Sequence, residues 1–205
     1  MPLLRNENEK RRNRVVMKQN WKPGTLVYPA PAVMVSVGKE ESEYNILTVA
    51  WTGTICSDPA LCYISVRPER HSYAILKKNR EFVINLTTED LAYATDWCGV
   101  RSGKDYNKFK EMNLTPGKSH IVQAPFIEES PLCIECRVKE IIPLGTHDMF
   151  LAEVVNILAD ERYIHPVTGA FDLEKAKLLA YSHGKYHGLG KLIGKFGWSV
   201  QRKKR

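Results

Sequence analysis

The sequence has no long apolar run. No stretch of its 205 residues approaches the ~18 consecutive apolar residues that a membrane-spanning helix needs. The opening segment, MPLLRNENEKRRNR, is charged where a secretory signal would need an apolar centre. We therefore expect a soluble, cytoplasmic protein with no membrane association.

The sequence also lacks a second CxxC pair, which a structural zinc site would need. Its five cysteines are an odd number, and without a secretion signal they are expected to stay reduced. Cys133 and Cys136 form one CxxC, but apolar and charged residues alternate over 132–142, as in a β-strand. Residues three apart on a strand face opposite sides. We therefore predict Cys136 inside and Cys133 outside, and neither a zinc site nor a redox pair.

Two patterns near the C-terminus are incomplete. His183 and His187 have a metal-binding spacing on a helix, but the glycines between and after them argue against a helix. Residues 188–194 read GxGxxxG, yet no βαβ unit can follow them, and Phe196 stands where a phosphate-binding P-loop requires Ser or Thr. We predict no metal site and no dinucleotide-binding loop here, and assign the glycines to tight turns.

Acidic residues are scarce at both ends of the chain. Residues 1–22 carry a net charge of +5 and residues 185–205 carry +7, so the 162 residues between them sum to −5. Basic ends can contact nucleic acid, but they are more often solvated tails. No zinc-finger, RNP or helix-turn-helix signature accompanies them. Nucleic-acid binding is therefore disfavoured.

The chain does contain a succession of short β-rich runs, at residues 25–28, 32–38, 44–56, 61–67, 81–86, 132–142 and 149–158. Helical patterns occur at 71–79, 88–98 and 104–112, and most prolines fall between the runs, as expected in a sheet protein. Many strands with few helices favour a mainly β, antiparallel, Greek-key-like barrel over a doubly wound sheet.

The length favours a single domain, since domains commonly hold about 100–200 residues, and an apolar content of 43% is enough for a core. We place this domain at residues 21–200, between a basic arm at 1–20 and a basic tail at 201–205. Residues 149–158, MFLAEVVNIL, are apolar at both strand parities except for Glu153 and Asn156. A strand of this kind is usually covered on both faces, and we expect a second subunit to supply the cover.

A dense set of polar groups lies between residues 44 and 85. It contains two arginines and several hydroxyls around one tryptophan: Thr48, Thr52, Thr54, Ser65, Arg67, Arg70, Ser72 and Trp51. Hydroxyls, guanidinium groups and the backbone amides of a helix start can together hold an anion. A ligand with a phosphate at one end and a flat ring system at the other would suit this set.

Each of these residues also has an ordinary structural interpretation. Ser72 or His71 could simply cap the helix expected at 71–79. Trp51 could be a core residue, which is the commoner fate of tryptophan. Asn45 could be a turn residue before the strand, although its donors and acceptor also suit the edge of a heterocycle.

Two further candidates are ambiguous on sequence alone. Lys108 lies in a highly charged segment and looks like a solvated surface lysine, as Lys104 and Lys110 do. His147 precedes Asp148 near the start of the 149–158 strand, and a lone histidine is more often structural.

Several segments, taken in order, resemble the flavin reductase-like, FMN-binding split-barrel family, and most closely its flavoredoxin-type members. Asn45 and Trp51 match the flavin-binding segment, and SDPALCYISVRPERHSYAIL resembles the strand and helix start that follow it. DWCGVRSGKDYNKF (96–109) places Lys108 on the family's lysine. His147-Asp148 and YHGLGKLIGKFGWSV (186–200) match later motifs, so the resemblance covers roughly residues 20–200.

The resemblance implies an FMN-binding split β-barrel that is homodimeric and holds FMN non-covalently near the dimer interface. Such a protein would pass hydride or electrons from NAD(P)H, a transient donor, or from a reduced carrier, through FMN to a redox partner or a small-molecule acceptor. The alternatives are a non-enzymatic FMN electron carrier or flavin-storage protein and, less favoured, a nucleic-acid-binding protein. Related barrels also bind pyridoxal phosphate. The implied cofactor-binding residues are Asn45, Thr48, Val49, Ala50, Trp51, Thr52, Ser65, Val66, Arg67, Ser72, Lys108, His147 and Tyr181, with no acid or base for substrate chemistry and no metal ligand.

Overall fold

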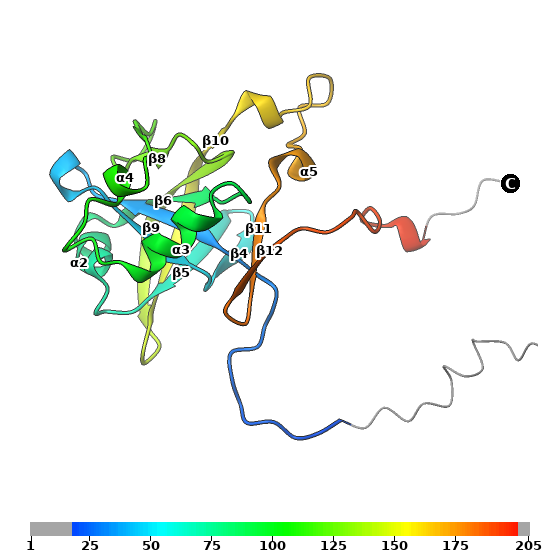
Figure 1. Cartoon of the computed structure of the whole chain (residues 1–205), viewed down its shortest axis with the longest axis horizontal. Coiled ribbons are helices and arrows are strands. Elements are labelled where there is room, and N and C mark those ends of the chain that lie inside the picture. The colour runs from blue at the N-terminus through cyan, green and yellow to red at the C-terminus, as the bar shows by residue number, and fades with distance from the viewer. Residues whose placement is uncertain (1–17, 201–205) are drawn as a thin grey trace, which may run out of the picture.

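A computed structural model describes residues 18–200, so the predicted tail and most of the predicted N-terminal arm lie outside the described residues. Its centre is a seven-stranded antiparallel sheet (Figure 1). The strand order is β3-β2-β6-β9-β10-β5-β4. The strands are β2 (Val33–Val37), β3 (Asn45–Val49), β4 (Thr52–Ser57), β5 (Ala60–Val66), β6 (Glu81–Leu86), β9 (Leu132–Pro143) and β10 (Asp148–Ala159).

The remaining elements surround this sheet. A three-stranded sheet has the order β1-β11-β12, and a two-stranded one pairs β7 with β8. These strands are β1 (Ala30–Pro31), β7 (Pro116–Gly117), β8 (Phe126–Ile127), β11 (Leu179–Ser182) and β12 (Lys185–Gly188). The helices are α2 (His71–Asn79), α3 (Ala92–Val100), α4 (Lys108–Glu111) and α5 (Leu173–Ala176), with short 3-10 turns η1 (Glu41–Glu43), η2 (Glu161–Tyr163) and η3 (Trp198–Val200). None of the helices between residues 18 and 200 is long and apolar enough to cross a membrane.

The predicted mainly β, antiparallel architecture is confirmed, and the large sheet is open rather than closed. The run at 44–56 divides into β3 and β4, which form the two edges of the sheet. The strand predicted at 25–28 is wrong, because these residues form no strand. The helix at 71–79 has the predicted bounds, whereas the one expected at 104–112 has only the four residues of α4.

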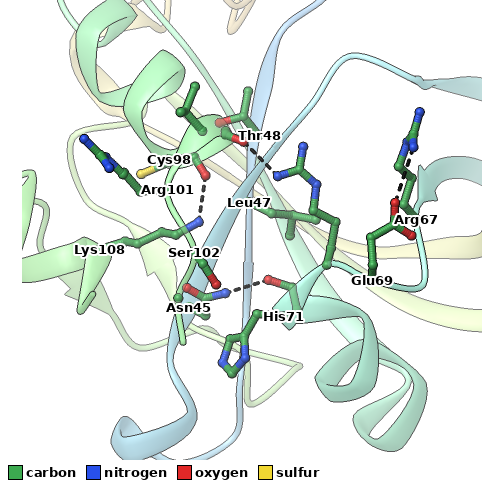
Figure 2. Close-up of a pocket in the computed structure, with 15 residues that line it drawn as sticks. Asn45, Leu47, Thr48, Arg67, Glu69, His71, Cys98, Arg101, Ser102 and Lys108 are labelled. Atoms are coloured by element: carbon green, nitrogen blue, oxygen red, sulfur yellow. Dashed lines mark hydrogen bonds and ion pairs between the residues drawn. The ribbon is translucent and has the colours of Figure 1, made fainter. Parts of the chain in front are cut away.

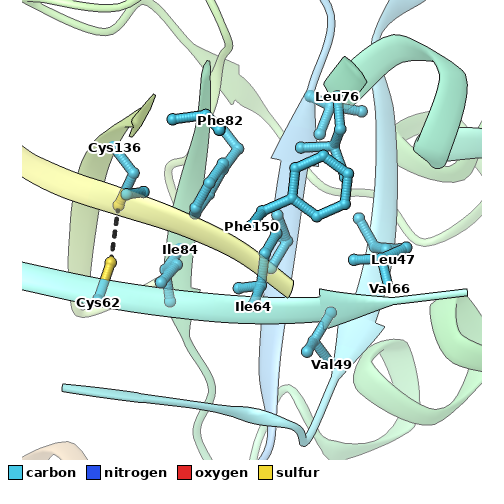
Figure 3. Close-up of a cluster of buried hydrophobic side chains, with 14 of the residues drawn as sticks. Leu47, Val49, Cys62, Ile64, Val66, Leu76, Phe82, Ile84, Cys136 and Phe150 are labelled. Carbon is cyan, nitrogen blue, oxygen red and sulfur yellow. Dashed lines mark hydrogen bonds between the residues drawn. The ribbon is translucent and has the colours of Figure 1, made fainter. Parts of the chain in front are cut away.

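The core lies between the faces of the curved sheet, and most of its side chains come from β2, β3, β5, β6, β9 and β10 (Figure 3). Phe82 and Phe150 are fully buried at its centre. All five residues of β2 are buried, because α3 and α4 cover its other face through a second cluster around Met34, Ile46 and Phe109. This second cluster fixes the edge strand β3 against α3, which is important for the site.

Strand β9 explains the correction to the cysteine prediction. Cys136 lies in the main core, and Cys133 faces the opposite side of the strand, as predicted. Cys133 is nevertheless only 3% exposed, because Val122 and Ala124 cover that face. The prediction that Cys133 points outward is therefore wrong.

Glu135 holds this covering loop in place, although its charge suggested an exposed position. Its side chain is fully buried. The carboxylate accepts hydrogen bonds from the backbone amides of His120, Ile121 and Val122, at 2.7–3.0 Å, and from the Asn156 side chain at 2.8 Å. Burial alone would raise the pKa of Glu135, but these hydrogen bonds outweigh it and hold the pKa below its ordinary value.

The Cys62 and Cys136 sulfur atoms lie 3.5 Å apart in the main core (Figure 3). They belong to β5 and β9, which are separated by β10. Two strand spacings are about 9.6 Å, and a disulfide needs Cα atoms closer than about 7 Å. The contact is therefore between two packed thiols.

Replacing the buried carboxylate should destabilise the fold. We expect Glu135→Gln to lower the free energy of unfolding by about 1–3 kcal/mol at pH 7, since an amide group would face amide donors. Because the folded-state pKa is lowered, this contribution is present above the unfolded pKa and is lost as pH falls through the folded value. Urea denaturation at pH 7 and under acid conditions measures both effects. Glu140→Gln, exposed on the same strand, should stay within about 0.5 kcal/mol of wild type, and equal effects of the two changes would contradict this account.

Candidate functional site

Three adjoining hollows lie along β3, β4 and β5 and the helices that follow them. The first, which we call the cationic hollow, has a volume of ≈ 430 Å³. The second, the ring hollow, has ≈ 190 Å³ and shares Leu47, Thr48, Arg67 and Arg70 with the first. The third, the apolar hollow, has ≈ 500 Å³ and shares Ala50, Trp51, Ser65 and His147 with the second. The three therefore form one continuous groove.

Positive charge gathers in the cationic hollow from three parts of the chain. Arg67 and Arg70 flank the turn between β5 and α2, Arg101 follows α3, and Lys108 begins α4. Figure 2 shows Lys108 and Arg101 on one side of the hollow and Arg67 on the other. Among its lining residues only Glu69 is acidic, and it pairs with Arg67 at 3.3 Å. The hollow is therefore suited to an anion.

The start of α2 adds to this character. Its N-cap residue is Arg70, which makes no side-chain capping bond, and both His71 and Ser72 line the hollow. The first-turn amides of a helix and its macrodipole favour a bound anion. The interpretation of Ser72 as a helix cap is therefore wrong, because Ser72 lies inside the first turn.

Buried contacts fix the floor of the cationic hollow. The Asn45 amide donates to the Ser72 hydroxyl at 2.7 Å (Figure 2), and both residues are buried. Gly103 packs onto this pair, since a Cβ there would lie 2.1 Å from the Asn45 Oδ1 atom. Asn45 is the first residue of β3, so its interpretation as a turn residue is wrong.

The far wall is fixed to α3. Arg70 donates through Nη1 to the Gly99 carbonyl at 2.9 Å, and the Thr48 hydroxyl donates to the Thr95 carbonyl. A guanidinium group has five N–H donors, so Arg70 keeps donors for a ligand. These contacts hold β3, α3 and the start of α2 at fixed positions around the hollow.

Lys108 is not the solvated lysine that its charged surroundings suggested. It is only 3% exposed, and its ammonium donates to the carbonyls of Ile46 and Cys98, both at 2.7 Å. Desolvation by burial lowers the pKa of Lys108 to about 8. An ammonium has three donors, so one N–H remains for a ligand in the hollow.

The ring hollow has a different lining. Trp51 and Tyr181 contribute aromatic rings, and His147 comes from the loop before β10. Tyr28 supports both aromatic residues, with ring centroids 6.3 Å from Trp51 and 6.0 Å from Tyr181. Burial, and then the charge of Arg67, hold the pKa of His147 below its ordinary value. A neutral imidazole and two aromatic side chains suit a flat ring system.

Tyr181 reaches this site through a tight hairpin. Strands β11 and β12 are joined by His183 and Gly184, whose φ angles of 50° and 81° are both positive. Positive φ at both central positions matches the twist of a two-residue hairpin, and glycine adopts it without strain. The prediction of a tight turn in this segment is therefore confirmed at Gly184.

All of the sequence-predicted site residues line this groove, but they divide between its hollows. Asn45, Ser72 and Lys108 line the cationic hollow, whereas Val49, Val66 and Tyr181 line the ring hollow. Thr48 and Arg67 line both, and Ala50, Trp51, Ser65 and His147 line the ring and apolar hollows. Thr52 lies only in the apolar hollow, where its hydroxyl donates to the Tyr63 carbonyl at 2.6 Å, so it is separated from the arginines.

Sequence reasoning assigned no role to Arg70 in the site and missed Arg101 and Ser102, all of which line the cationic hollow. The three residues come from the β5–α2 turn and the end of α3. The available signal was the segment 96–109, in which Arg101 and Ser102 lie between the matched Cys-Gly and the matched lysine.

Comparison with known proteins agrees with this architecture. Residues 25–190 match the family model described as flavin reductase like domain. Flavoredoxin of Desulfovibrio vulgaris is 27% identical, with a TM-score of 0.83 over 90% of this chain and 100% of that one. A putative flavin reductase with a split barrel domain from Shewanella frigidimarina is 22% identical, with a TM-score of 0.73 over 81% and 85% of the two chains, and shares the fold.

A curated relative has a named reductase role. The reductase component of 4-nitrophenol 4-monooxygenase/4-nitrocatechol 2-monooxygenase from Rhodococcus opacus is 28% identical over 112 residues, which are 55% of this chain and 57% of the relative. The family match extends over most of the chain and confirms the resemblance of its motifs. The chain therefore belongs to the flavin reductase-like domain family, whose members are flavin-associated oxidoreductases.

Proposed function

We propose that this protein binds FMN non-covalently and passes hydride or electrons through it, from NAD(P)H or a reduced carrier to an acceptor. The observation that carries the proposal is the continuous groove, which is cationic at one end and aromatic in its middle. FMN has a phosphate at one end and a flat ring system at the other. The two ends of the ligand thus correspond to two differently lined parts of one groove.

The donor set fits this cofactor. Arg67, Arg70 and Arg101 and the start of α2 would hold the phosphate, because charge-assisted bonds to phosphate are among the stronger protein hydrogen bonds. Trp51, Tyr181 and His147 would hold the ring system. Between them, Thr48 lines both hollows and would contact the connecting polyol chain. Bound FMN would supply the redox chemistry, and the protein would bind and orient it.

The protein's own contribution would be positional. The buried pair Asn45 and Ser72 and the backbone-anchored Lys108 are held by hydrogen bonds within the protein, so their orientation is set before a ligand arrives. The aromatic lining of the ring hollow would exclude water from one part of the ring. NAD(P)H would dock transiently beside the ring hollow, since the central sheet is antiparallel and provides no dinucleotide-binding βαβ unit.

The main alternative is an FMN electron carrier or flavin-storage protein that does not itself react with NAD(P)H. Anaerobic mixing of the FMN-loaded protein with NADH or NADPH separates the two, because only a reductase would bleach the flavin bands rapidly. Pyridoxal phosphate would also satisfy the cationic hollow, and an absorption spectrum of the purified protein distinguishes it from FMN. A gel shift that disappears when both basic ends are trimmed would instead support nucleic-acid binding.

We expect FMN to bind at least about tenfold more tightly than riboflavin, because only FMN carries the phosphate. Arg70→Gln should weaken FMN binding about tenfold, which corresponds to about 1.4 kcal/mol, the low end for a hydrogen bond to a charged group. Riboflavin binding should not change. Flavin-fluorescence titrations of the apoprotein measure both, with Arg137→Gln, an exposed residue of β9, as the control. Equal affinities of wild type for FMN and riboflavin would contradict the phosphate assignment.

The lowered pKa of Lys108 gives the site a pH signature. The FMN phosphate is dianionic above its second pKa of about 6, while free Lys108 loses its charge as pH rises through about 8. FMN affinity should therefore fall about tenfold between pH 7 and pH 9.5, since a charge-assisted bond is worth roughly 1.5–3 kcal/mol. The fall should disappear in Lys108→Met and persist in Lys104→Met and Lys110→Met, which change exposed lysines.

Fluorescence titrations at several pH values provide this measurement, with thermal melting as a check that Lys108→Met remains folded. If that variant does not fold, the wild-type profile still decides the question. An affinity that stays constant from pH 7 to pH 9.5 would remove Lys108 from the site.

We also propose that the protein is a homodimer. Large apolar side chains are exposed on β10 and on the segments that extend from the body at either end of the described chain (Figure 1). They include Trp21, Val27, Ile157, Leu192, Ile193 and Phe196. Soluble monomers rarely expose so much contiguous apolar surface, and a second copy would cover it.

Light scattering at micromolar concentration should therefore give about twice the 23.4 kDa chain mass. Ile157→Asp, on β10, should shift the protein toward the monomer, because it would place a charge in the covered surface. Ile121→Asp, at a similarly exposed position on a loop, is the control. A wild-type monomer that still binds FMN would separate the cofactor site from any interface.

A further inference from the structure

The apolar hollow differs in chemistry from the rest of the groove. Its lining contains no Lys, Arg, Asp or Glu, whereas the cationic hollow contains four cationic side chains. Its walls are mostly apolar and include Trp51, Tyr63 and Leu144. The volume of ≈ 500 Å³ falls in the range of small-molecule sites, roughly 300–1,000 Å³.

The apolar hollow also adjoins the part of the groove assigned to the flavin ring. Trp51, Ser65 and His147 line both hollows, so a molecule in one would lie against the same side chains as a ring in the other. The Thr146 hydroxyl and the His147 ring lie 3.0 Å apart at this junction and can offer a hydrogen bond to an oxygen substituent. The hollow thus has apolar walls and a small polar region on the side of the ring hollow.

We propose that the apolar hollow binds the uncharged, flat, conjugated ring compound that serves as electron acceptor, of the nitroarene or quinone class. This proposal rests on the proposed FMN function. The flat walls provided by Trp51 and Tyr63 favour a ring, and apolar burial stabilises it. Charged acceptors are disfavoured, because an anion placed among these residues would lose hydration without gaining a partner.

Nitrobenzene and 4-nitrobenzoate form a matched pair of probes, since they share a nitroaromatic ring and differ by one fixed charge. Each is titrated into oxidised, FMN-loaded protein under conditions in which no turnover occurs. Perturbation of the flavin absorption bands and equilibrium dialysis give two independent binding curves. We expect one nitrobenzene per chain, bound at least about tenfold more tightly than 4-nitrobenzoate.

Two variants locate the binding. Leu144→Lys places a charge at the wall of the apolar hollow and should weaken nitrobenzene binding about fivefold or more, while FMN affinity stays unchanged. Leu173→Lys, on α5, is the matched control, because both leucines are more than half exposed and Leu173 lines none of the three hollows. Ala30→Leu fills the apolar hollow without adding charge and should also weaken nitrobenzene binding.

The outcomes separate this proposal from the one beneath it. If FMN does not load, both are overturned. If FMN loads and nitrobenzene does not bind, or 4-nitrobenzoate binds as tightly, only the acceptor proposal is overturned. Equal effects of Leu144→Lys and Leu173→Lys would move the binding elsewhere. Binding that appears only after dilution to monomers would instead assign the apolar hollow to a second copy of the chain.

Discussion

One buried ammonium group connects the segments that surround the cationic hollow. Lys108 begins α4, and its two hydrogen bonds reach the carbonyl of Ile46 in β3 and that of Cys98 in α3. An edge strand, a helix and the following short helix are thereby held together around a single charge. The cationic hollow lies on the other side of this junction, so its shape depends on the ammonium being there. Burial of Lys108 is therefore part of how the fold builds its site, and desolvation gives the group its lowered pKa.

The groove as a whole is organised by the separation of charge from apolar surface. At one end, Arg67, Arg70, Arg101 and Lys108 face one acidic residue that is already paired. At the other end, the lining has no charged side chain other than the titratable His147. A ligand lying along the groove would need a strongly anionic end and a flat, weakly polar end. This combination supports a phosphorylated flavin, and it leaves the uncharged end for a second, neutral ring.

The sequence contained enough information for the architecture and for much of the groove. The period-2 runs predicted the strands of the central sheet, and the polar set around Trp51 indicated the site, because these signals are local. The environments of Lys108, Cys133 and Glu135 were not predictable in this way. Each is buried by a segment distant in the chain: Lys108 by β3, and Cys133 and Glu135 by the loop at 118–125. Arg101 was missed for the same reason, since only the folded chain brings α3 opposite the β5–α2 turn.

The central claim is that the cationic hollow holds the phosphate of a bound FMN. Phosphorus NMR of the FMN-loaded protein tests it most directly, because free FMN titrates at its second phosphate pKa of about 6. Beside three arginines and a helix start, the bound phosphate should remain dianionic, and its resonance should stay constant from pH 5.5 to pH 7.5. A bound resonance that titrates as free FMN does would place the phosphate in solvent and contradict the account.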